Sequence, residues 1–197
     1  RPVTIVPVYL GYEHVMEVKS YQKELKGSGK KKESTTQVFS AIRKLKNYGH
    51  AYVNFGEPIA LHTFLDKQVP DWRDDISDDD KKPKWLTPTV NILASTIMTR
   101  INENAALNGT ALLAFCLLSS KTHVMSKDDL VKAIDDFLIL FKTNPYSQDA
   151  TFPENEATEL VDHTLALNRF QQSEDQYGLM VSPKPDNAVL LTFYRNN

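Results

Sequence analysis

The sequence predicts an α/β portion at its start, followed by a mainly α-helical portion that ends in a β-hairpin. Three observations lead to this fold class. An apolar, β-branched run opens the chain at Val3 to Leu10, which is typical of a strand buried on both faces of a parallel sheet. Apolar residues then recur at helical spacing from about residue 90 to residue 165,. Near the end, two apolar runs flank a turn at residues 183–187, which indicates a hairpin.

Composition narrows the class of protein. The chain has 197 residues, enough for one real core,. Its net charge of -2 gives no general electrostatic reason to bind nucleic acid,. The single cysteine, Cys116, excludes an internal disulfide framework, and we expect an inert buried thiol there,. The longest apolar run, Ala111 to Leu118, falls far short of the roughly 20 residues that cross a bilayer,.

The first portion contains two predicted strands around a predicted helix. Val3 to Leu10 and Ala51 to Phe55 are the strands, and a helix is expected from about Ser34 to Tyr48, with Gly49 ending it,. The order strand, helix, strand predicts a crossover unit in an α/β sheet. Such a strand needs partners, so we expect the chain to be a piece of a larger enzyme. Residues 69–84, rich in aspartate, are expected to form a surface loop.

The second portion begins with a predicted helix whose first turn holds Pro88,. A compact apolar segment follows at residues 110–119. Ser126-Lys-Asp-Asp129 resembles a capped start of the next helix,. A further helix is expected over residues 157–165. Two strands, residues 179–181 and 188–194, complete the predicted hairpin.

Several segments of the chain resemble one enzyme family. Val3-Thr-Ile-Val-Pro-Val8 resembles the fourth sequence block of the glycerolipid acyltransferases, a short apolar strand with a fixed proline. More stretches, in the right order, resemble the C-terminal region of the bacterial membrane-associated glycerol-3-phosphate 1-O-acyltransferases: residues 1–17, Tyr52-Val-Asn-Phe-Gly-Glu-Pro58, Val69-Pro-Asp-Trp-Arg73, Trp85-Leu-Thr-Pro-Thr-Val-Asn91 and Leu191-Thr-Phe-Tyr-Arg-Asn-Asn197. The resemblance covers essentially the whole chain.

The resemblance implies both a domain plan and a reaction. Residues 1–86 would be the C-terminal part of an acyltransferase α/β domain, and residues 87–197 a helical C-terminal domain with a terminal hairpin. The parent enzyme would move a fatty acyl group from acyl-CoA or acyl-carrier protein to the sn-1 hydroxyl of glycerol 3-phosphate. It would act peripherally at the cytoplasmic face of the bacterial inner membrane, as a step of phospholipid biosynthesis. We expect it to need no cofactor and no metal.

The catalytic block of that family is not found in this sequence. The family uses a His-x4-Asp pair, in which the histidine is the general base and the aspartate orients it. His123-Val-Met-Ser-Lys-Asp128 has this spacing, but a helix cap explains Asp128 without chemistry,. His62 and Asp66 have the wrong spacing. We therefore assign no catalytic residue and expect the fragment to be inactive alone.

Substrate-binding residues are expected at the opening strand and just beyond its end. The resemblance assigns Val6, Pro7 and Val8 to the acyl-donor side of the site; alternatively, Pro7 only interrupts a strand,. Glu13 and His14 follow the strand end, where α/β enzymes usually place chemistry,. His14 would touch substrate phosphate or the acyl donor, or else be a structural, hydrogen-bonded histidine.

Three other features have simpler interpretations. Five lysines surround Gly27-Ser-Gly29 and form either a solvated loop or a patch that attracts anionic lipid or carrier protein: Lys23, Lys26, Lys30, Lys31 and Lys32,. The aspartates between residues 71 and 80 lack the glycine and closing glutamate of a calcium loop,. Three helices followed by a hairpin outline a winged-helix module, so the alternative function is a non-catalytic protein-interaction module. Its acidic helix argues against nucleic acid as the partner,.

Overall fold

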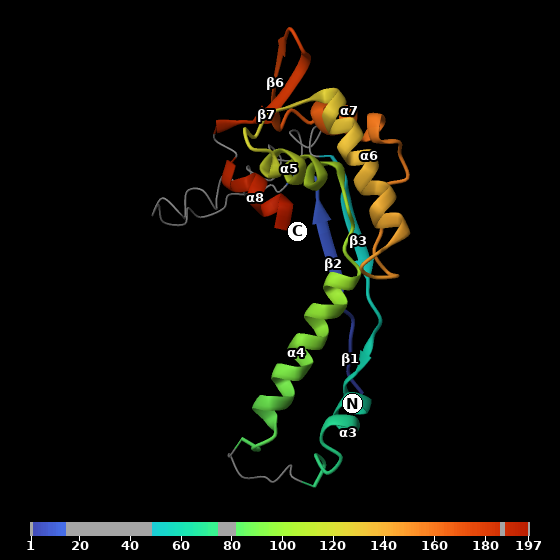
Figure 1. Ribbon diagram of the computed structural model, residues 1–197. Coiled ribbons are helices and arrows are strands. Elements are labelled where there is room, and N and C mark those ends of the chain that lie inside the picture. The colour runs from blue at the N-terminus through green and yellow to red at the C-terminus, as the bar shows by residue number, and fades with distance from the viewer. Residues whose placement is uncertain (1, 15–48, 75–81, 186–187, 197) are drawn as a thin grey trace, which may run out of the picture. The chain divides into compact units, whose positions relative to one another are not determined.

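The computed structural model describes residues 2–14, 49–74, 82–185 and 188–196. These residues form two compact units, each assembled from segments that are distant in the sequence (Figure 1). Unit 1 takes its residues from 1–10, 53–106 and 146–151. Unit 2 takes its residues from 11–52, 107–145 and 152–197. The sequence predicted a boundary at residue 86 between part of an acyltransferase domain and a helical domain. The two units do not test this boundary, which stays a prediction.

Unit 1 combines short strands with two helices. Strand β1 (Thr4–Ile5) pairs antiparallel with β4 (Ile59–Ala60), and Ile5 lies opposite Ile59. Strand β2 (Val8–Tyr12) pairs with β3 (Ala51–Phe55), and both strands continue from unit 1 into unit 2. The helices are α3 (Leu61–Gln68) and α4 (Leu86–Glu103).

The opening strand differs from the sequence prediction in two ways. It is divided into β1 and β2, because the backbone leaves the strand at Val6 and Pro7. The pairing is antiparallel, since the Gly56 N–H donates to the Pro7 carbonyl while the Glu13 N–H donates to the His50 carbonyl. The prediction of a parallel sheet was therefore wrong. The prediction of a strand buried on both faces was also wrong, because Val3, Val6 and Leu10 are exposed. An apolar run alone does not distinguish a buried strand from one with an uncovered face.

Helix α4 confirms the predicted amphipathic helix but buries little of it. Among its described residues only Thr89 is buried, while Val90 and Met98 of the predicted apolar stripe are exposed. Its C-terminal half is held by polar contacts within unit 1. The Arg100 guanidinium donates to the Glu57 carbonyl at 2.7 Å and pairs with the Glu57 carboxylate at 2.8 Å.

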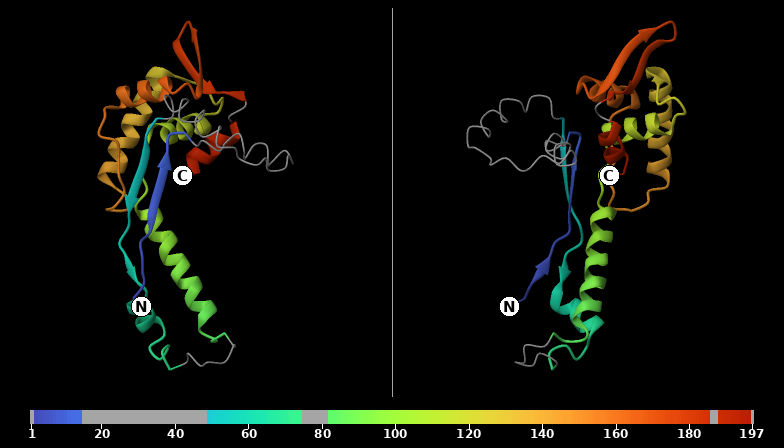
Figure 2. Two further views of the ribbon diagram at one scale, coloured as in Figure 1. Left: turned by 180° about the vertical axis from the view of Figure 1, so that it is seen from behind. Right: turned by 90° about the vertical axis from the view of Figure 1, so that its left-hand side faces the viewer.

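Unit 2 contains four helices and three strands of its own in its described part. Its elements are α5 (Gly109–Ser119), β5 (Met125–Ser126), α6 (Lys127–Thr143), α7 (Ala157–Ala166), β6 (Phe170–Asp175), β7 (Gly178–Pro183) and α8 (Ala188–Asn196). The antiparallel sheet has the strand order β5-β7-β6. Four helices accompany this sheet in the described part of unit 2, and the β6–β7 hairpin projects beyond the helices of its unit (Figure 2).

A continuous apolar core holds unit 2 together. Helix α5 is its centre, because Leu112, Leu113, Ala114, Cys116 and Leu117 are all buried. Helices α6 and α7 each add one apolar face, as the helical spacing predicted,. The cap of α6 is also confirmed: the Ser126 hydroxyl accepts the Asp129 N–H at 3.1 Å,.

The predicted terminal hairpin was placed one element too late. The structure has its hairpin at residues 170–183, with Gly178 at a positive φ of 99° beside the turn. The segment after the Pro-Lys-Pro turn is instead helix α8, which packs against α5. Leu191 and Tyr194 are three positions apart and both buried, which fits helical spacing. Strand β6 escaped detection because Gln171 to Asp175 are all polar.

Two predictions lie outside the described residues. The helix expected from Ser34 to Tyr48 and the lysine cluster around Gly27 both fall within residues 15–48. Across the described parts of the chain, no helix is both long enough and apolar enough to cross a membrane.

Candidate functional site

A cluster of polar side chains surrounds the buried Glu13 in unit 2. Glu13 directly follows β2, and His50 directly precedes β3, so the strand pairing brings them together. Tyr52 lies in β3, and His163 comes from the last turn of α7. The four residues belong to one unit although Glu13 and His163 are 150 positions apart.

Both carboxylate oxygens of Glu13 are held by donors. Oε1 accepts the Tyr52 hydroxyl at 3.0 Å. Oε2 accepts the His50 backbone N–H at 2.8 Å and lies 3.0 Å from His163 Nε2. His50 Nδ1 is 3.3 Å from the same oxygen. The carboxylate is only 1% exposed, so these contacts replace the water that it loses on burial,.

The electrostatics of the cluster favour an ionised carboxylate. Burial by itself raises the pKa of Glu13, but hydrogen bonds from His163, from the His50 backbone and from Tyr52 outweigh it, so the pKa lies below its ordinary value,. The pKa of Tyr52 is raised, because its hydroxyl is buried and faces the Glu13 charge. At neutral pH the site therefore holds a carboxylate next to a neutral phenol.

Gly49 provides the space that the carboxylate occupies. Its φ is +72°, which side chains other than glycine rarely adopt,. A Cβ at this position would lie 2.2 Å from Glu13 Oε2 and 2.8 Å from Glu13 Cβ. The residue expected to end a helix therefore has a second role, because it allows the backbone to approach Glu13 closely.

The structure distributes the predicted substrate-binding residues over two units. Val6 is exposed, Pro7 is buried and Val8 is half-buried, all in unit 1. Glu13 is the centre of the polar cluster in unit 2, and His14 is a half-buried residue in the bend after it. Sequence reasoning identified Glu13 but missed His50 and His163. No local signal joins those histidines, because strand pairing and helix packing bring them together.

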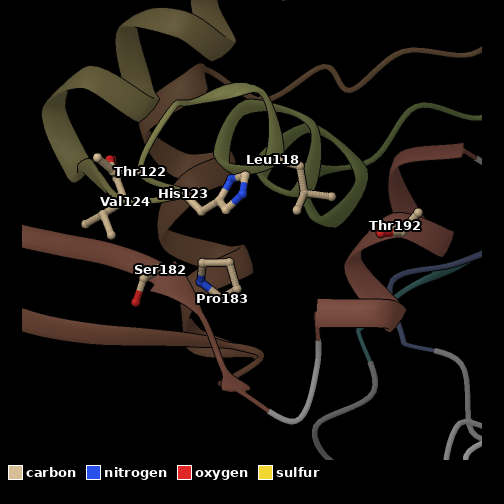
Figure 3. A pocket seen from close by; sticks show the side chains of 7 residues that line it. All are labelled: Leu118, Thr122, His123, Val124, Ser182, Pro183 and Thr192. Carbon is tan, nitrogen blue, oxygen red and sulfur yellow. The ribbon is translucent and has the colours of Figure 1, made fainter.

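A hollow in unit 2 contains His123, whose spacing to Asp128 resembles the catalytic pair of the family. It has a volume of about 530 Å³ and is lined by Leu118, Thr122, His123, Val124, Ser182, Pro183 and Thr192. Figure 3 shows the His123 ring directed into the space between Leu118 and Pro183. Its Nδ1 lies 3.1 Å from the Leu117 carbonyl. Asp128 does not line this hollow and sits exposed in the first turn of α6.

The Glu13 cluster can act chemically in two ways. A carboxylate that contacts an imidazole can orient and charge that imidazole, as in base-and-orienter pairs. Two imidazole nitrogens and one carboxylate oxygen within 4.8 Å of one another can also share a metal ion,. The structure therefore supplies a preformed polar site, with Tyr52 and Gly49 as its support.

Comparisons with known proteins give a consistent result. Residues 21–197 match the family described as the glycerol-3-phosphate acyltransferase C-terminal region. The chain is similar to proteins named glycerol-3-phosphate acyltransferase: it is 64% identical over 198 residues to that of Alteromonas mediterranea, 59% over 198 to that of Pseudoalteromonas atlantica and 50% over 197 to that of Aeromonas hydrophila. Each alignment covers 100% of this chain and 24% of the relative. The chain thus spans about a quarter of the length of these relatives.

Proposed function

The chain belongs to the family of glycerol-3-phosphate acyltransferase C-terminal regions, and on this premise we propose that it is part of an enzyme that acylates glycerol 3-phosphate. The acyl donor would be acyl-CoA or acyl-carrier protein, and the acceptor the sn-1 hydroxyl. The parent would work peripherally at the cytoplasmic face of the bacterial inner membrane. The observation that carries this proposal is the 64% identity, over the whole chain, to a protein of that name.

The reaction needs a general base, and the one pair of this chain with the family's His-x4-Asp spacing does not fit that role. The acceptor hydroxyl must lose a proton as it attacks the thioester carbonyl, and the thiolate leaves. His123 and Asp128 have the required spacing, but Asp128 caps the dipole of α6 and His123 contacts the Leu117 carbonyl,. We therefore assign catalysis to residues of the parent outside residues 1–197, and propose that Val6, Pro7, Val8, Glu13 and His14 support substrate binding.

An exposed apolar face of unit 1 supports the proposal that the chain works together with other parts of the parent enzyme. Val3, Val6, Leu10, Val53 and Phe55 are exposed, and Phe55 reaches 69%. Leu10, Val53 and Phe55 lie on the paired strands β2 and β3, and exposed apolar residues on neighbouring strands mark an interaction surface,. Because the relatives are about four times longer than the chain, we assign this face to packing against the rest of the parent enzyme. On this view residues 1–86 complete an acyltransferase domain.

The test is an acyl-transfer assay with labelled glycerol 3-phosphate and palmitoyl-CoA. Membranes that contain the full-length parent should form labelled lysophosphatidic acid, and the purified 197-residue chain should form none. Product from the chain alone would contradict the assignment of catalysis to the rest of the parent. His123→Ala in that chain would then show whether His123 is the base.

A second candidate function is a protein-interaction module, which the topology of unit 2 favours. The helix and strand order of unit 2 is that of winged-helix domains. The exposed residues of its third helix, α7, include Glu159 and Asp162, and the hairpin tip carries Glu174 and Asp175. Phosphate contacts need cations, so a protein surface suits this face better than nucleic acid. Glu174→Lys should leave the stability unchanged, because its exposed side chain makes no contact that holds the turn, and should weaken binding to such a partner. Asp175 is left intact because its carboxylate accepts the Tyr177 N–H within the turn.

A further inference from the structure

We propose that Glu13, His50 and His163 bind one divalent transition-metal ion, for which zinc is the best match, and that the ion fastens the ends of β2 and β3 to α7 within unit 2. The proposal does not rest on the acyl-transfer function. It replaces the expectation, drawn from the sequence, that the chain needs no metal.

The separations within the cluster suit a tetrahedral ion. Zinc binds imidazole nitrogen and carboxylate oxygen at about 2.0–2.2 Å, so two ligands at a tetrahedral angle are roughly 3.3–3.6 Å apart. Glu13 Oε2 lies 3.0 Å from His163 Nε2 and 3.3 Å from His50 Nδ1. The two imidazole rings stack with centroids 4.9 Å apart. All three ligand atoms lie within 4.8 Å of one another. Because stacked rings do not aim their nitrogen lone pairs at one point, one imidazole must turn about its Cβ–Cγ bond before both nitrogens bind a single ion.

The donor set selects the kind of metal. Two imidazoles and one carboxylate suit zinc and its first-row neighbours, whereas calcium and magnesium prefer sites made of oxygen ligands. Neutral imidazoles are the metal-binding form, and the Glu13 carboxylate contributes one negative charge. The ion would therefore partly neutralise a charge that is otherwise 1% exposed.

The two histidines connect the site to solvent. The His50 and His163 side chains are 66% and 38% exposed, while Glu13 lies beneath them. An ion can therefore reach the cluster from solvent, and water can complete its coordination. The arrangement of three protein ligands with one open position is that of zinc sites that keep a water ligand.

The groups around the ligands hold the carboxylate in a binding orientation. The Tyr52 hydroxyl occupies Oε1, and the His50 backbone N–H occupies one lone pair of Oε2. Gly49 leaves the space that Glu13 fills. Such partners fix the direction of a ligand, and their loss typically weakens metal affinity roughly 10- to 100-fold.

The same contacts also describe a hydrogen-bonded cluster without an ion, in which His163 Nε2–H donates to Glu13. The experiment must separate these states, and Co²⁺ does so because its absorption reports tetrahedral nitrogen and oxygen ligands directly. The 197-residue chain, freed of metal with a chelator, is titrated with Co²⁺ and then with Zn²⁺. We expect one Co²⁺ per chain with tetrahedral absorption bands, and displacement of Co²⁺ by Zn²⁺.

Variants assign the site to its residues. His163→Ala and His50→Gln should lose the Co²⁺ bands, and Tyr52→Phe should weaken binding roughly 10- to 100-fold. His62→Ala is the matched control, because His62 lies in unit 1, where its ring contacts that of Trp72 at a tilt. His123→Ala is a second control within unit 2. Circular dichroism verifies that each variant is folded.

Stability supplies an independent readout. Zn²⁺ should raise the Tm of the wild-type chain and of the His62→Ala control, but not that of His163→Ala. Absence of stoichiometric Co²⁺ binding by the folded wild-type chain would overturn the proposal and leave a hydrogen-bonded cluster. Equal binding by wild type and His163→Ala would overturn it too, because the ion would then sit elsewhere.

Discussion

The two units of this chain differ in how much apolar surface they bury. Every member of the continuous buried core cluster lies in unit 2, around α5. Among the described residues of unit 1, the buried apolar side chains are Pro7, Ile59 and Ala106. Unit 1 nevertheless exposes large apolar side chains, among them Phe55 on β3 and Val90 and Met98 on α4.

This difference indicates two sources of stability. Apolar burial contributes roughly 25 cal/mol per Å², so unit 2 has its own driving force for folding. Unit 1 has little of it and depends on polar contacts such as those of Arg100 with Glu57. We infer that unit 2 is the stable element of the chain and that unit 1 gains its cover from the rest of the parent enzyme.

The largest expected effect is in the core of unit 2. Leu113 is fully buried in α5, and Leu113→Ala should lower the free energy of unfolding by about 2–5 kcal/mol,. Met98→Ala on α4 is the matched control in unit 1 and should cost less than about 0.5 kcal/mol, because Met98 is 55% exposed,. Urea unfolding followed by circular dichroism measures both. Equal losses would mean that the two units share one core.

The next effect tests the close approach at the Glu13 cluster. Gly49→Ala should destabilise the chain by about 1–3 kcal/mol in addition to backbone strain, because its Cβ would overlap Glu13 Oε2,. Gly178→Ala is the control: its φ is also positive, at +99°, but no atom lies within 4 Å of the added Cβ. It should therefore cost only the strain, about 1–2 kcal/mol. If both variants lose the same stability in thermal unfolding, Gly49 has no steric role.

A third test measures how the reactivity of Cys116, in the core of unit 2, depends on pH and on folding. Burial raises the pKa of the Cys116 thiol from its ordinary 9.0 to about 11. The neutral thiol is favoured in the folded chain, so its contribution to stability is complete below pH 9 and is lost as the pH rises towards 11,. Iodoacetamide should modify Cys116 slowly in the native chain at pH 9 and rapidly in urea, since the thiolate is the nucleophile. Fast native labelling at pH 9, followed by mass spectrometry, would show that this core opens readily.

The smallest effect on stability is expected at the uncovered face of unit 1. Phe55→Ser should change the unfolding free energy of the 197-residue chain by less than about 0.5 kcal/mol, because the side chain is already exposed,. The same substitution should reduce acyl transfer by the full-length parent if this face packs against its other parts. Thr99→Ala, at an exposed position of α4, is the control and should preserve activity. Full activity of the Phe55→Ser parent would remove this face from the proposed interface.

The local sequence pattern predicted where helices lie better than it predicted which strands pair with each other. The spacing of apolar residues located α4, α6 and α7, and Ser126 located the start of α6. Pattern failed at the two ends of the chain. The run from Val3 to Leu10 and the run from Ala188 to Tyr194 are both rich in apolar residues, but one is a half-exposed antiparallel ribbon and the other is a helix. Short apolar runs fit several environments, and tertiary packing selects among them.

The sequence by itself determined the family, the main helices and the capping of α6, because these depend on residue identity and on spacing within about 20 positions. The tertiary structure alone decided the strand pairing, the position of the hairpin and the polar cluster. Glu13 was visible in the sequence as a residue after a strand, but His163 joins it only because α7 packs in unit 2 next to the ends of β2 and β3. A site assembled across 150 positions leaves no periodic signal, since its residues meet through the packing of separate elements.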